Sequence, residues 1–120
     1  MTNENQLIIA LGYCIFMLII FFIYFKYPPK KINYFYGYRT RRSMQNNETW
    51  SFANKYAAKL LINFSVYSFF IPPFLYFLYP KNNFIITIII HTALILSVLY
   101  FTETQLKRKF KEKDHHKISN

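Results

Sequence analysis

The residues with the clearest potential for chemistry lie in one basic segment in the first half of the chain. Arg39, Arg41 and Arg42 lie there beside the hydroxyl groups of Thr40 and Ser43. Guanidinium groups match the geometry of phosphate oxygens, so this cluster would suit phosphate binding. A basic segment beside a membrane has a more ordinary role, because it sets orientation and attracts anionic lipids by about 1 kcal/mol per basic residue. The residue types alone favour the ordinary role.

Two polar residues stand out because they lie inside long apolar stretches. His91 is near the middle of one stretch, and Asn63 is in another. An ionisable group at that depth of a membrane is costly and usually faces other helices or water. His91 could shuttle a proton or contact a ligand, but a neutral ring bonded to a neighbouring hydroxyl or to Asn63 is the simpler expectation. Cys14 is expected to be a small packing residue without a partner.

The sequence shows no catalytic constellation. It has no paired carboxylates within an apolar stretch, no glycine-rich phosphate loop and no activated serine or cysteine. A single cysteine rules out an intrachain disulfide framework and a cysteine-based zinc site. We therefore expect no enzymatic activity, no cofactor and no metal ion.

Three windows without Asp, Glu, Lys or Arg must position these residues: 7–25, 60–79 and 84–101. At about 1.5 Å rise per residue, each helix would be about 27 to 30 Å long, which matches the hydrocarbon core of a bilayer. A soluble bundle would need polar positions about every 3.6 residues, and runs such as residues 15–22 have none. The sequence predicts an all-α integral membrane protein with three transmembrane helices. Residues 1–120 would form a single membrane domain with an inner loop 26–59 and a basic tail 102–120.

Basic residues are distributed very unevenly around these windows. Segment 26–59 carries eight and the tail six, whereas the N-terminal segment has none and the connector 80–83 has only Lys81. The positive-inside rule therefore predicts an outside N-terminus and a cytoplasmic C-terminus. This distribution accounts for 14 of the 15 basic residues, so the net charge of +10 gives no reason to expect nucleic-acid binding. The first window should remain as an anchor, because residues 1–6 lack the basic start of a signal peptide.

Proline, glycine and asparagine residues predict where the elements begin and end. Pro28 and Pro29 should end the first helix, and Gly37 should allow a turn with positive φ. Asn46 suits the N-cap of a second helix that starts near residue 47. Pro72 and Pro73 predict a kink in the outer half of the second span, which is more simply structural than a gating hinge. The connector 80–83 is so short that the second and third spans must be antiparallel neighbours.

The inner loop carries a spaced motif that resembles the SdpI family of small bacterial membrane proteins. The motif covers about 22 residues between one span and two more, and it reads Asn33-x-x-x-Gly37-Tyr38-Arg39-Thr40-x-x-Ser43-Met44-x-Asn46-x-x-x-Trp50-x-x-Ala53-Asn54. The sequence departs from the family pattern at Ile32, where a proline would be expected.

The resemblance implies a non-enzymatic protein of the bacterial cytoplasmic membrane. The name-giving member of the family has additional spans, protects its producer against a secreted toxic peptide and sequesters a transcriptional repressor at the membrane. The resemblance thus implies an immunity or signalling role, the bilayer and a toxin peptide or cytosolic repressor as partners, and possible oligomers. The residues that the motif marks as important are Asn33, Gly37, Arg39, Thr40, Ser43, Trp50 and Asn54.

The roles implied for these residues differ. Gly37 would form the turn, and Arg39 and Thr40 would make polar contacts. Trp50 would anchor the loop at the membrane interface, and Asn54 would tie the loop to the helix. Two alternatives remain open: a small transporter that uses His91 and the proline kink, and a structural subunit of a membrane complex.

Overall fold

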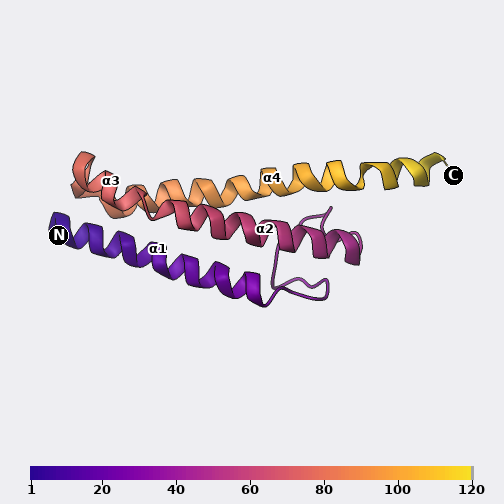
Figure 1. Ribbon diagram of the computed structural model, residues 1–120, viewed down its shortest axis with the longest axis horizontal. Helices are drawn as coiled ribbons and strands as arrows, with labels where there is room; N and C mark the ends of the chain where they lie inside the picture. Colours follow the sequence, from indigo (N-terminus) through magenta and orange to yellow (C-terminus); the bar gives the residue numbers. More distant parts are fainter. Residues whose placement is uncertain (120) are drawn as a thin grey trace.

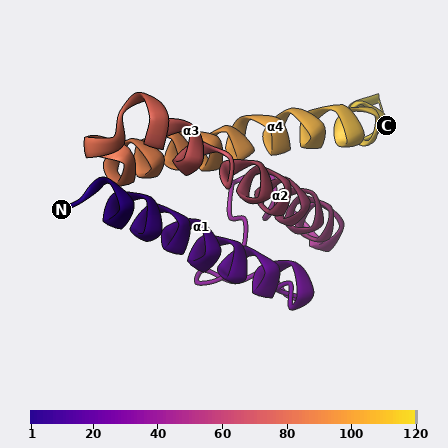
Figure 2. The same cartoon turned by 60° about the vertical axis from the view of Figure 1, so that its left-hand side comes forward.

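The computed structural model describes residues 1–119, with the side chains of residues 1–110, and this part of the chain is helical apart from its connecting segments. The helices are α1 (Asn3–Lys26), α2 (Asn47–Ser68), α3 (Ile71–Leu78), the short 3₁₀ helix η1 (Pro80–Asn82) and α4 (Asn83–Ser119). Figure 1 shows α1, α2 and α4 running side by side along the 65 Å axis of the molecule. Each of these three helices packs against the other two (Figure 2).

Three helical stretches within the described residues are long and apolar enough to cross a membrane: Asn3–Lys26, Asn47–Leu78 and Pro80–Phe110. This confirms the predicted all-α architecture with three candidate spans. Small side chains such as Ala10, Cys14, Ala57 and Ala58 are buried between the helices, whereas many large apolar side chains are exposed. That distribution suits a bilayer, because lipid is as apolar as the protein interior and small residues let helices approach closely.

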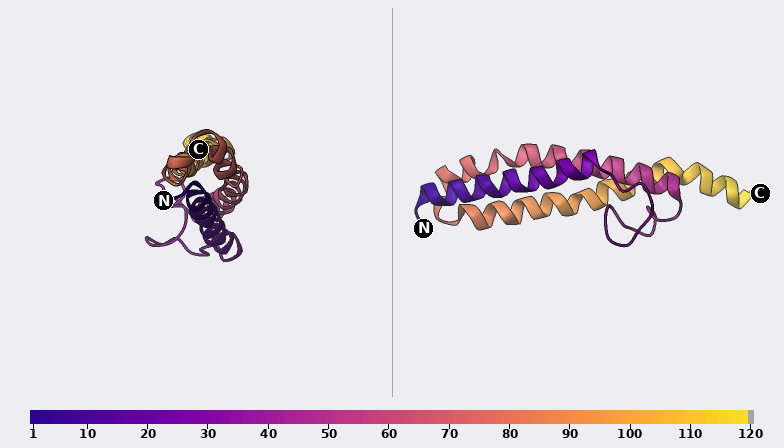
Figure 3. Two further views of the ribbon diagram at one scale, coloured as in Figure 1. Left: turned by 90° about the vertical axis from the view of Figure 1, so that its left-hand side faces the viewer. Right: turned by 90° about the horizontal axis from the view of Figure 1, so that it is seen from below.

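The segment between α1 and α2 lies at the end of the bundle opposite the N-terminus, and the last turns of α4 extend beyond it (Figure 3). α1 ends at Lys26, with Tyr27 as its C-cap directly before the two prolines, as predicted. α2 begins at Asn47 because Asn46 caps it in a reciprocal capping box. The Asn46 side chain accepts from the Thr49 amide at 2.9 Å, and the Thr49 hydroxyl accepts from the Asn46 amide at 3.1 Å.

The predicted kink is a complete break between two helices. α2 ends at Ser68 and α3 begins at Ile71, so that Pro72 and Pro73 lie in a first turn, where a missing amide proton costs little. Pro72 also leaves the Ser68 carbonyl without its helical donor, and this carbonyl accepts from the Cys14 thiol at 3.7 Å. Cys14 is a free and fully buried cysteine, as expected for a small packing residue, and the break in α2 gives its thiol a backbone acceptor.

The short connector brings α4 back along α2, as predicted. Asn83, fully buried at the start of α4, donates to the Pro72 carbonyl at 2.9 Å and accepts from the Thr87 hydroxyl at 3.1 Å. The Phe84 amide donates to the Gln6 side chain at 2.9 Å. These bonds fix α4 to both α3 and α1 at this end of the bundle.

Candidate functional site

The motif loop is attached to the bundle by the side chain of Asn54, which is buried in α2. Its Oδ1 atom accepts a hydrogen bond from the Tyr38 amide at 2.7 Å and a second one from the Tyr24 hydroxyl. Its Nδ2 atom donates to the Trp50 carbonyl at 2.9 Å. One amide group thus joins α1, the loop and α2, and the expected tie between loop and helix is present.

Gly37 is needed at its position for two reasons. Its φ is 111°, a conformation that residues with a Cβ atom rarely adopt. A Cβ atom at this position would also lie only 2.6 Å from both Asn54 Oδ1 and Pro29 Cγ. The predicted turn is therefore confirmed, and it serves to bring the loop backbone into direct contact with the Asn54 side chain.

Trp50 has a different place from the one expected. Its side chain is fully buried, and its indole Nε1 donates to the Pro29 carbonyl at 2.8 Å. The prediction that Trp50 anchors the loop at the membrane interface was wrong. The segment at Pro29 lies over the first turns of α2 and covers the Trp50 ring, so the ring packs beneath the loop.

Asn33 forms the turn at the tip of the loop. Its Oδ1 atom accepts from the amides of Phe35 at 2.9 Å and Tyr36 at 2.7 Å, and its Nδ2 atom donates to the Lys31 carbonyl at 2.9 Å. This arrangement leaves the rings of Tyr34 and Phe35 76% and 92% exposed. Two aromatic side chains are thus presented to the surroundings on an ordered turn.

Thr40 and Ser43 are bonded to each other. The Thr40 amide donates to the Ser43 hydroxyl at 2.8 Å, and the Ser43 amide donates to the Thr40 hydroxyl at 3.1 Å. The Thr49 hydroxyl then donates to the Ser43 carbonyl at 3.0 Å, which links this turn to the start of α2. Arg39 differs from these residues, since its side chain is exposed and makes no hydrogen bond or ion pair with the side chains that the structure describes.

Tyr38 carries the loop across to α4. Its hydroxyl lies within hydrogen-bond distance of Glu103 Oε1 at 2.7 Å and of the Leu99 carbonyl at 3.2 Å. Arg42 Nε lies 3.5 Å from Glu103 Oε2. Burial raises the pKa of the Tyr38 phenol well above its usual value, and the hydrogen bond and negative charge of Glu103 raise it further. The phenol therefore stays protonated, as a donor to the carboxylate requires.

Sequence reasoning did not select Tyr24, Tyr38 or Glu103 as parts of this site. Tyr38 lies inside the quoted motif, directly after Gly37. Glu103 is the first acidic residue after the third apolar window, in a tail where basic residues predominate. An acidic residue directly after an apolar window, in a tail rich in basic residues, was the available signal for a partner of the loop arginines.

His91 is buried inside the bundle and joins three helices. Its Nδ1 atom lies 3.1 Å from the Tyr13 hydroxyl of α1, and its Nε2 atom lies 3.3 Å from the Ser65 hydroxyl of α2. A neutral imidazole has one donor and one acceptor, and hydroxyl groups can complement both. The expected hydroxyl partners are present, whereas Asn63 is exposed and does not contact the ring. Within the described residues, no three potential ligands among His, Cys, Asp and Glu lie close enough to hold a metal ion.

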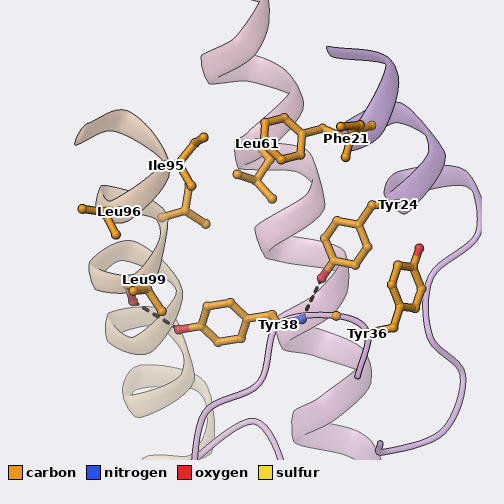
Figure 4. A pocket seen from close by; sticks show the side chains of 11 residues that line it. Phe21, Tyr24, Tyr36, Tyr38, Leu61, Ile95, Leu96 and Leu99 are labelled. Atoms are coloured by element: carbon orange, nitrogen blue, oxygen red, sulfur yellow. Dashed lines mark hydrogen bonds between the residues drawn. The ribbon is translucent and has the colours of Figure 1, made fainter. Parts of the chain in front are cut away.

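A groove of about 330 Å³ lies directly above the loop, between α1 and α4. Figure 4 shows Phe21 and Tyr24 on one side, the side chains of α4 on the other, and the loop tyrosines at the lower end. Its walls are almost entirely apolar, and the lining residues are Ile20, Phe21, Tyr24, Tyr36, Gly37, Tyr38, Leu61, Ile95, Leu96, Val98 and Leu99. The motif loop therefore closes one end of an apolar groove.

The two glycines of the chain offer a matched test of the loop geometry. Gly37→Ala should lower the midpoint of thermal unfolding in detergent, because the new methyl group must displace Asn54 and force a strained φ, at a cost of about 2 kcal/mol or more. Gly12→Ala is the control, since nothing lies within 4 Å of the added Cβ atom in α1. Equal midpoints for the two variants would show that Gly37 is not constrained in this way.

The comparisons with known proteins agree with the motif. Residues 30–101, which include the loop and most of the helical hairpin that follows, match the SdpI/YfhL protein family. The uncharacterized protein YfhL of Bacillus subtilis (strain 168) is 40% identical over 81 residues, which cover 68% of this chain and 70% of the relative. No solved structure matches. The chain therefore belongs to the SdpI/YfhL protein family.

Proposed function

We propose that this protein is a non-enzymatic binding protein of the bacterial cytoplasmic membrane. It protects the cell by capturing a membrane-active toxin peptide in the groove between α1 and α4. The observation that carries this proposal is the groove itself, with its apolar walls and its end closed by the family motif. The immunity role implied by the family resemblance supports it.

The position of the groove supports an occupant that arrives through the bilayer. Leu96 lines the groove and is 59% exposed, and the groove lies between two helices that are long and apolar enough to cross a membrane. An apolar peptide segment can bury surface there without leaving the hydrocarbon region. Under the positive-inside rule, the many basic residues of the loop and tail support an orientation with the closed end of the groove on the cytoplasmic side.

The tip of the loop supports a second role, the docking of a cytosolic regulator. Tyr34 and Phe35 are exposed on the ordered Asn33 turn, and Arg39 and Arg41 are exposed nearby in the chain. Aromatic and arginine side chains are enriched at protein interfaces. A soluble protein bound to this surface would respond when an occupant of the groove alters the conformation of the loop.

The structure gives weaker support to a transport role. His91 has a hydroxyl partner at each ring nitrogen and is stacked on Phe21, with ring centres 6.2 Å apart. This environment suits a packing residue that satisfies buried polar groups in the bundle. The proline pair lies in the first turn of α3, at the break between α2 and α3, where it has a structural explanation.

A survival assay tests the immunity proposal. Cells that express the protein are challenged with secreted membrane-active peptides encoded by the source strain. Leu96→Trp should fill the groove and abolish protection, so that the inhibitory concentration of the peptide falls to the value for cells without the protein. Ile89→Trp is the matched control, since Ile89 is 62% exposed two turns earlier on the same helix and does not line the groove. It should protect as the wild type does.

Two results would contradict this proposal, provided that membrane levels of the variants are equal. In one, the wild-type protein gives no protection against any of the peptides. In the other, Leu96→Trp protects as well as Ile89→Trp, which would place the protective surface outside the groove.

The docking role has its own test. We expect transcription regulators encoded beside the gene to move to the membrane fraction when the wild-type protein is expressed, and to remain soluble with the double variant Tyr34→Ser/Phe35→Ser. The survival assay provides a control, since this variant should still protect. Recruitment that is unchanged in the double variant would rule out the loop tip as the docking surface.

A further inference from the structure

A second pocket, of about 490 Å³, lies between the start of α2 and α4, and it shares no lining residue with the groove. It is lined by Lys55 and Lys59 of α2, Lys109 of α4 and the rings of Phe52 and Tyr56, and completed by Glu48 and Ser51. Neither the motif nor the proposed peptide groove accounts for this pocket.

The pocket gathers positive charge from two helices. Lys55 and Lys59 are four residues apart on α2, so they lie one above the other on the same face, and Lys109 adds a third ammonium group from α4. Like charges at this spacing repel each other, and the lining holds three ammonium groups against the single carboxylate of Glu48, so its excess positive charge favours a further anion. Within the side chains that the structure describes, none of the three lysines forms an ion pair.

An aromatic wall holds one of these charges in place. Lys109 Nζ lies 4.2 Å from the centre of the Phe52 ring, within the range of a cation–π interaction. Phe52 is itself stacked on Tyr56, with ring centres 5.9 Å apart, and meets the edge of Phe110 at the same distance. The ammonium group of Lys109 is therefore positioned against the pocket wall.

The pocket lies beside the end of the uncharged part of the second span, where lipid phosphates are expected. Lys59 is the last charged residue before the uncharged stretch 60–79, which forms the apolar part of the second span. A lysine at the end of such a span extends its ammonium group to the membrane interface. Lysine binds phosphate as a point charge, without the fixed geometry that arginine requires.

We propose that this lysine pocket binds the phosphate group of an anionic phospholipid head group. The three ammonium groups hold the phosphate, and the rings of Phe52 and Tyr56 form the apolar side of the pocket against the glycerol and the start of the acyl chains. This site is independent of the peptide groove, so its failure would leave the proposed function untouched.

The test uses the full-length protein in neutral detergent, titrated with a short-chain phosphatidylglycerol. We expect the triple variant Lys55→Gln/Lys59→Gln/Lys109→Gln to bind at least about tenfold more weakly than the wild type, because each basic residue contributes a few-fold to binding. The triple variant Lys26→Gln/Lys30→Gln/Lys31→Gln is the control. It loses the same charge at exposed positions that do not line the pocket, and it should bind within about twofold of the wild type.

Two further measurements distinguish a lipid phosphate site from loss of structure and from a site for free phosphate. The variant Lys55→Arg/Lys59→Arg/Lys109→Arg keeps the charge and should retain binding, which distinguishes a phosphate site from simple loss of structure. Inorganic phosphate should bind at least about tenfold more weakly than the lipid, because it lacks the glycerol and acyl groups. Equal losses in the pocket and control variants, or no loss in either, would overturn the proposal. If inorganic phosphate bound as tightly as the lipid, and this binding also required the three lysines, the pocket would be a site for free phosphate and not for a lipid head group.

Discussion

The arrangement of this protein depends on one buried amide group, the side chain of Asn54. Its oxygen accepts hydrogen bonds from the Tyr38 amide of the loop and the Tyr24 hydroxyl of α1, and its nitrogen donates to the backbone of α2. A buried acceptor or donor left unpaired costs about 1 to 3 kcal/mol. Loop, first helix and second helix must therefore keep one relative position, and Gly37 is the residue that lets the loop backbone come close enough.

From this fixed loop, the remaining features of the loop end of the bundle follow. Tyr38 continues from the Asn54 contact to Glu103 of α4, so the third long helix is held by the same loop. The groove between α1 and α4 is closed where these contacts lie. Farther along the bundle, His91 joins the same three helices through two hydroxyl groups. Polar side chains thus set the spacing of helices whose outer surfaces are apolar.

Local sequence signals were sufficient for the elements, because each signal acts on its own neighbourhood. The uncharged windows predicted the three spans, Pro28 and Pro29 the end of α1, the Asn46 cap the start of α2, and Gly37 the turn. Pro72 and Pro73 predicted a kink, and the structure has a break between two helices there. The partners across the bundle could not be predicted in this way. Tyr24 and Glu103 lie 30 and 49 residues from Asn54 in the chain. The acidic charge of Glu103 was a signal for a basic partner, but nothing in the sequence indicates that the loop folds back onto both residues. The role of Trp50 was predicted wrongly because an aromatic residue in a basic loop next to a span also suits a membrane interface. Only the folded structure shows that the segment at Pro29 covers its ring.

The exchange rate of one amide proton tests the central claim, that Asn54 holds the loop against the bundle. Tyr38 and Tyr34 lie four residues apart in the same loop; the Tyr38 amide donates to the buried Asn54 oxygen, whereas within the described residues the Tyr34 amide has no acceptor. Hydrogen exchange measured by NMR on the protein in lipid nanodiscs should show the Tyr38 amide exchanging at least about a hundredfold more slowly than the Tyr34 amide. Similar, fast exchange at both positions would show that the loop is not docked, and it would contradict this account of the fold and of the groove that the loop closes.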